Sequence, residues 1–86
     1  MTTRDATAST IVDWLNDRRS RFNAPYGILQ RDRGKYIAIV FGVAGILDAE
    51  VRVYASNWLL LRSSISGNHV FRSLDDLLRD MTARFA

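Results

Sequence analysis

The chain of 86 residues has no cysteine and a single histidine. Without cysteine it forms no disulfide bond and no thiolate metal site. One histidine and scattered carboxylates offer no ligand set for a metal, and no cofactor-binding motif is present. The composition therefore predicts neither a metal nor a cofactor, and a reducing cytoplasm is the expected compartment.

Long hydrophobic segments are absent as well. The longest apolar run, residues 36–47, contains Gly42 and Gly45 and is shorter than the roughly 18 residues that a membrane helix needs. No apolar stretch follows Arg4 in the N-terminal segment, so this segment does not have the pattern of a secretory signal. We expect one soluble domain over residues 1–86, with residues 1–7 frayed.

Lysine is scarce, since eleven of the twelve basic residues are arginine and the formal net charge is +3. Residues 18–35 hold six of these cations against one carboxylate. Clustered cations interleaved with aromatic rings are typical of nucleic-acid binding, although a solvated or protein-facing patch explains the same charges. The charges converge only if the end of the first helix and the turn at residues 32–34 share one edge of the sheet. Nucleic-acid binding is therefore an alternative function, with these candidate residues: Arg18, Arg19, Arg21, Arg31, Arg33 and Lys35.

Residues 35–43, with the sequence KYIAIVFGV, predict the central strand of a sheet. Both of its alternating faces are apolar, whereas a strand with one face in water alternates apolar and polar residues. We therefore expect this strand inside the sheet rather than at its edge.

An N-terminal helix is expected from Ser9 or Thr10 to about Phe22. Hydrophobic residues follow a helical spacing there, and acidic residues precede basic ones as the helix dipole favours. Ser9 or Thr10 can cap its start, and Asn23 and Pro25 are expected to end it.

A C-terminal helix is expected after Ser73, a capping residue followed by Asp75 and Asp76 in the first turn. The spacing of its apolar side chains predicts one buried stripe. The stripe consists of Leu74, Leu77, Leu78, Met81 and Phe85.

Three further segments predict strands: residues 26–31, 48–55 and 58–63, followed by a short last strand at residues 69–71. Turns or loops are expected between them, at residues 32–34, 42–45, 56–57 and 64–68. Residues 48–55 alternate strictly between polar and apolar, so one face of that strand meets water or a partner.

The predicted fold is a two-layer α+β sandwich in α-β-β-β-β-α order, with an antiparallel sheet of three to five strands. Each helix has one apolar stripe, and both stripes are buried if the helices lie side by side on one face of the sheet. The other face then mixes apolar side chains with charged ones, as a contact surface or a homodimer seam does. A strongly coiled sheet, or a helix that crosses over to cover this face, is the alternative.

No catalytic set emerges from the sequence. His69 lies near several serines and carboxylates, but no nucleophile motif surrounds those serines. We interpret His69 as a loop residue whose ring nitrogens form hydrogen bonds with water or with the backbone. Asp48 and Glu50 share one face of a predicted strand. A solvated strand face explains these two carboxylates more simply than a catalytic acid-base pair does. We therefore expect no enzymatic activity.

The helix-strands-helix order resembles that of the double-stranded RNA-binding domain. Such domains meet phosphate with a lysine-rich start to their last helix, whereas here that helix opens with Asp75 and Asp76. Carboxylates at a helix start repel phosphate. The resemblance is thus one of topology and argues against that function.

The leading hypothesis is a small non-catalytic module that binds another protein as an adaptor or an inhibitor, with homodimerisation as a further option. Its size is shared with the short inhibitors of phages and mobile elements. We expect no small-molecule substrate and no membrane partner. Rigid aromatic rings and arginines are the usual anchors of protein interfaces. The candidate partner-binding residues are Arg31, Arg33, Lys35, Arg52, Tyr54 and Trp58.

Overall fold

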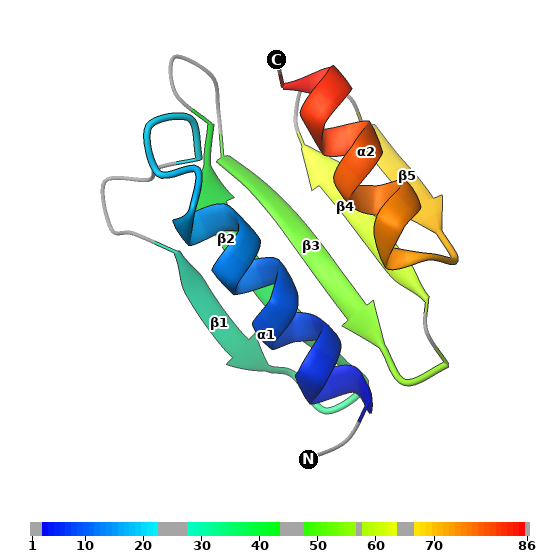
Figure 1. The fold of residues 1–86 in the computed structure, drawn as a ribbon. Helices are drawn as coiled ribbons and strands as arrows, with labels where there is room; N and C mark the ends of the chain where they lie inside the picture. Colours follow the sequence, from blue (N-terminus) through cyan, green and yellow to red (C-terminus); the bar gives the residue numbers. More distant parts are fainter. Residues whose placement is uncertain (1–2, 23–27, 44–47, 57, 64–66, 86) are drawn as a thin grey trace.

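The computed structural model describes residues 3–22, 28–43, 48–56, 58–63 and 67–85. A helix comes first, five strands follow, and a second helix ends the chain (Figure 1). The elements are α1 (Thr3–Asn16), β1 (Leu29–Asp32), β2 (Tyr36–Gly42), β3 (Asp48–Tyr54), β4 (Leu59–Ser63), β5 (Gly67–Phe71) and α2 (Leu74–Arg84). This is the α+β sandwich that the sequence predicts, with the largest expected number of strands.

The five strands form one antiparallel sheet in the order β1-β2-β3-β4-β5. Each strand therefore pairs with its neighbour in sequence. The expected central strand is β2, which lies inside the sheet between β1 and β3. Strands β1 and β5 form the two edges.

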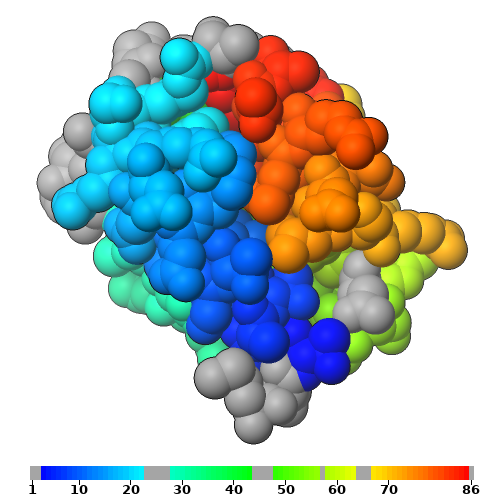
Figure 2. Space-filling view, in the orientation of Figure 1, coloured from blue at the N-terminus to red at the C-terminus, as the bar shows by residue number. Residues whose placement is uncertain are grey.

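Both helices lie on the same face of the sheet, α1 over β2 and β3 and α2 over β4 and β5 (Figure 1). They run in the same direction, so their C-terminal ends share one end of the molecule. Figure 2 shows the two helices side by side, covering most of this face. The side chains between the layers form one core. The sheet side of this core consists of Val43, which follows β2, and these strand residues: Ile37, Ile39, Phe41, Ala49, Val51, Val53, Leu59 and Leu61.

Helix α1 begins and ends about six residues earlier than its sequence pattern predicts. Residues 3–7, expected to be frayed, lie in the helix. Arg4 holds this first turn, because its guanidinium donates to the Gly34 carbonyl at 2.7 Å and to the Asp32 carboxylate at 3.3 Å. Ala8, in the next turn, is fully buried. A long-range contact that the helical pattern does not contain therefore fixes the start of α1.

The chain after α1 turns instead of continuing as a helix to Phe22. Arg18 N–H donates to the Leu15 carbonyl and Phe22 N–H to that of Arg18, which closes a compact turn. This turn brings the Phe22 ring into the core, where only 1% of the residue is exposed. The gain from burying an aromatic ring explains why the helix stops early.

Helix α2 matches its prediction. The Ser73 hydroxyl accepts a hydrogen bond from Asp76 N–H at 3.0 Å and caps the helix. Leu77, Met81 and Phe85 from the predicted stripe are buried in the core. Neither described helix is long and apolar enough to span a membrane.

Two strand boundaries differ from expectation. Asp32, expected in a turn, ends β1, and the reversal starts at Arg33, whose N–H donates to the Tyr36 carbonyl at 2.8 Å. Strand β5 begins at Gly67, inside the expected loop, at a φ of 74° that glycine adopts readily. Of the expected turns and loops, residues 44–45, 57 and 64–66 lie outside the described residues, as do residues 26–27 of the first expected strand.

Candidate functional site

The sheet face opposite the helices is not covered by any other described element, and we call it the open face. Side chains alternate between the two faces of a strand, and paired residues of neighbouring strands share a face. The pairing places these residues on the open face: Leu29, Arg31, Tyr36, Ala38, Val40, Asp48, Glu50, Arg52, Tyr54, Leu60, Arg62, Asn68 and Val70. Trp58 and Arg72 continue the same alternation beyond β4 and β5.

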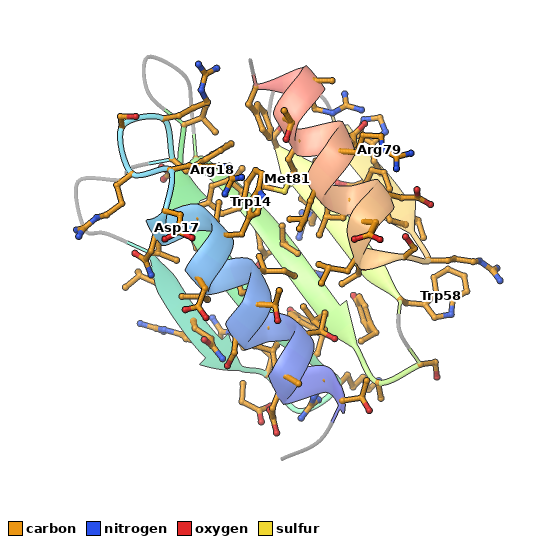
Figure 3. All side chains as sticks on the ribbon, viewed as in Figure 1. Trp14, Asp17, Arg18, Trp58, Arg79 and Met81 are labelled. Atoms are coloured by element: carbon orange, nitrogen blue, oxygen red, sulfur yellow. The ribbon has the colours of Figure 1, made fainter. Side chains whose placement is uncertain are left out.

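Large hydrophobic side chains are exposed on this face. Among the described residues, three large hydrophobic residues are exposed: Leu29 by 42%, Trp58 by 42% and Val70 by 54%. All three belong to the open face, and Figure 3 shows Trp58 at the margin of the molecule, near the start of α2. These residues share one face but lie apart on it, since Leu29 and Val70 belong to the two opposite edge strands and Trp58 comes just before β4.

Three aromatic residues form a row across the open face. Tyr36 pairs with Tyr54, and their ring centroids are 5.2 Å apart. Tyr54 N–H donates to the Trp58 carbonyl at 2.8 Å, so Trp58 comes next in the row. A hollow of about 340 Å³ lies between Tyr54 and Trp58 at the turn that joins β3 to β4.

Arginines stack on this aromatic row. The Arg52 guanidinium lies 4.5 Å from the centroid of the Tyr36 ring, and that of Arg72 lies 4.5 Å from the Trp58 ring. Burial lowers the pKa of Arg52, but hydrogen bonds to Tyr54 and Glu50 and the charge of Glu50 more than offset this effect and raise it. The rings and guanidiniums therefore hold one another in place before any partner binds.

Glu50 joins two arginines at the centre of the open face. Its Oε1 atom lies 2.7 Å from Arg52 Nε and 3.5 Å from Arg62 Nη1. The Arg62 side chain is 44% exposed, twice the 22% of Glu50, so Arg62 keeps donors for a partner. A second hollow of about 340 Å³ adjoins it, lined by Val40, Asp48, Ala49, Glu50, Arg62, Ser63 and Asn68.

Four of the six predicted partner-binding residues lie on the open face: Arg31, Arg52, Tyr54 and Trp58. The other two, Arg33 and Lys35, lie in the turn between β1 and β2. Sequence reasoning missed Tyr36, Leu60 and Val70. The pairing register of the strands identifies these residues, because it determines which apolar side chains lie on the same face as Arg52.

The basic stretch of residues 18–35 does not form one patch. Arg4, in the first turn of α1, donates to the Gly34 carbonyl, so the turn that carries Arg33 and Lys35 lies at the start of this helix. The arginines of residues 18–21 follow its end. A helix of 14 residues is about 20 Å long, so the two groups of cations lie at opposite ends of the molecule.

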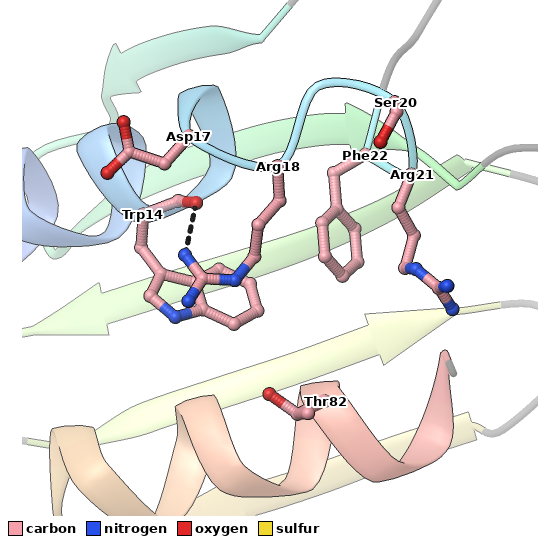
Figure 4. A pocket seen from close by; sticks show the side chains of 7 residues that line it. All are labelled: Trp14, Asp17, Arg18, Ser20, Arg21, Phe22 and Thr82. Carbon is pink, nitrogen blue, oxygen red and sulfur yellow. Dashed lines mark hydrogen bonds between the residues drawn. The ribbon is translucent and has the colours of Figure 1, made fainter.

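Two of these arginines bind the C-terminal ends of the helices (Figure 4). Arg18 lies 4.1 Å from the centroid of the Trp14 ring and donates to the Trp14 carbonyl at 3.0 Å. Arg21 donates to the Phe85 carbonyl at 2.5 Å. Cations are favoured at these carbonyls, so both arginines have structural roles. A hollow of about 360 Å³ between them is also lined by Asp17, Ser20, Phe22 and Thr82.

Away from the open face, two ion pairs join neighbouring turns of α2: Arg79 with Asp76, and Arg84 with Asp80. No group of three or more histidines, aspartates or glutamates among the described residues is arranged to hold a metal. His69, half-buried in β5, faces the helices rather than the open face. Comparison of this chain with protein-family models, with curated proteins and with solved structures finds no match.

Proposed function

We propose that this protein is a non-catalytic module that binds another protein through the open face of its sheet. The observation that carries the proposal is the location of the exposed hydrophobic residues. Those found among the described residues lie on this one face, which also carries a row of aromatic rings with arginines stacked on them. Apolar side chains, aromatic rings and arginines are the residues that protein interfaces favour.

The charge of the open face indicates the chemistry of the partner. Four arginines stand there against two carboxylates, Asp48 and Glu50. Glu50 engages Arg52 and Arg62 together, which leaves the centre of the face positive. A partner surface that combines apolar side chains with a carboxylate opposite Arg62 is complementary to this arrangement. Occupying such a surface is how an adaptor or an inhibitor of a larger protein acts.

Binding through this face is tested by capture from a lysate of the cells that make the protein. Immobilised wild-type protein is compared with Trp58→Ala and Arg62→Glu, and with Arg79→Ala as a matched control on α2, whose side chain is 81% exposed. We expect wild type and Arg79→Ala to capture the same protein. Trp58→Ala should weaken its binding by about 30-fold, the effect of losing one anchor residue, and Arg62→Glu should abolish it. Capture that survives both open-face substitutions would contradict the proposal.

Single-stranded nucleic acid is the second candidate ligand, because aromatic rows flanked by arginine also stack bases. One observation favours protein instead. The rings of Tyr36 and Trp58 already carry a guanidinium each, so a base would have to displace an arginine to stack on them. Titration of labelled single-stranded and duplex DNA at low and moderate salt separates the two candidates. Affinity that falls steeply with salt and is lost in Arg52→Ala would favour nucleic acid.

A further inference from the structure

The two edges of the sheet differ in their protection against pairing with another strand. The β1 edge is short and carries Arg31 and Asp32, and Asp32 is bound by Arg4. The β5 edge, Gly67–Phe71, contains no lysine, arginine, aspartate, glutamate or proline. Charges and prolines are the usual means by which proteins prevent strand addition at an edge. Among the described residues, only those of the β1 edge provide such protection.

The hydrogen-bond pattern shows which residues of β5 face outward. Tyr54 N–H donates to the Trp58 carbonyl, so this pair bonds β3 to β4. Backbone groups alternate along an antiparallel strand, so Leu59, Leu61 and Ser63 point toward β5. Their partners in β5 point back toward β4. The residues between these partners, Asn68 and Val70, therefore direct their N–H and C=O groups to the outer edge.

We propose that β5 pairs with β5 of a second copy of this chain and joins two sheets into one. Antiparallel pairing about a twofold axis at position 69 places Asn68 opposite Val70 of the second copy. The same axis places Val70 opposite Asn68 of the second copy. Each copy then uses both of its outward-facing residues, which is the self-complementary pattern of a twofold dimer. Val70, 54% exposed in one copy, gains neighbours across the axis.

The helix layer is compatible with this pairing. Helix α2 lies over β4 and β5, and strands are about 4.8 Å apart. Its axis is then about 5 Å from the twofold line, so the two α2 helices are about 10 Å apart, the spacing of packed helices. The α2 helices of the two copies run antiparallel in this arrangement. Figure 3 shows Arg79 on the side of α2 that lies over β5. Asp76 lies 3.9 Å from Arg79, so each helix brings both charges to this side.

A second copy is also favoured over a charged partner by the composition of this edge. Its side chains are formally uncharged apart from the titratable His69, which faces the helices. Arg72 is the next cation along the chain. Its side chain stacks on Trp58, which precedes β4, and is therefore directed away from the outer edge of β5. Two such edges meet without repulsion between fixed charges. The pairing uses the edge rather than the open face, so it goes beyond the proposed function and leaves that face available on both copies.

The dimer is tested by sedimentation velocity over a micromolar to millimolar concentration series. We expect the mass of the wild type to rise from 9.8 kDa toward twice that value. Val70→Pro removes one outward N–H but no bond to β4, and Val70→Lys adds an edge charge. Both variants should remain monomeric with unchanged circular dichroism. Gln30→Pro, which removes an outward N–H at the β1 edge, is the matched control and should dimerise like the wild type.

Amide exchange of the wild type gives an independent measurement. The N–H groups of Asn68 and Val70 should exchange more slowly as protein concentration rises, whereas that of Gln30 should not change. A wild type that stays monomeric throughout the series, or a dimer that both Val70 variants preserve, would overturn the proposal. Trp58→Ala should still dimerise, so failure of the dimer is distinguishable from failure of open-face binding.

Discussion

Phe22 is the residue that joins both helices to the sheet. Its ring lies 5.2 Å from that of Trp14 in α1, 5.8 Å from that of Phe41 in β2 and 6.1 Å from that of Phe85 after α2. The last two contacts are edge-to-face, a favourable geometry for aromatic pairs. A turn outside both helices thus supplies the centre of the core.

Replacing Phe22 with alanine should lower the free energy of unfolding by about 3–5 kcal/mol, because it leaves a cavity among three rings. The measurement is urea denaturation followed by circular dichroism. Phe22→Leu keeps most of the volume and should cost about 1.5 kcal/mol or less. Equal losses in the two variants would show that ring contacts, rather than volume, determine the effect.

Individual elements follow from the sequence to the extent that local patterns determine them. The stripe and the cap of α2 are local, and so is the strict alternation of β3, and both elements have the predicted form. The start of α1 depends on Arg4 reaching Gly34, and its end depends on the burial of Phe22. These contacts join distant parts of the chain, so helical periodicity does not reveal them. For the same reason the sequence predicts an open face that mixes apolar and charged residues, but it does not assign Tyr36 or Val70 to that face.

The cap of α2 makes a testable contribution at the scale of an element. Ser73→Ala removes the acceptor for Asp76 N–H and should lower the free energy of unfolding by about 1 kcal/mol. Ser73→Asp supplies another side-chain acceptor and should retain nearly all of the stability. Thermal and urea unfolding of the three proteins measure the difference. A Ser73→Asp variant as unstable as Ser73→Ala would show that the hydroxyl acts other than as a cap.

The whole molecule uses its two sheet faces differently. The helix-covered face holds the core, whereas Leu29 and Trp58 on the open face remain 42% exposed. Apolar side chains left in water contribute little to folding, because their burial is incomplete. They do favour association and lower solubility. The open face therefore has a cost in solubility that the folded chain alone does not require.

Replacing both Leu29 and Trp58 with lysine should lower the free energy of unfolding by no more than about 1.5 kcal/mol, because it removes the stack of Arg72 on Trp58 and some partly buried apolar surface. It should also raise the solubility limit, measured by ammonium sulfate precipitation. Leu61→Lys is the control, since Leu61 has no exposed surface and its replacement should unfold the protein. A large loss of stability in the double variant would show that the open face belongs to the folding core. A loss of stability within this limit together with lost partner capture would instead indicate that these side chains serve binding.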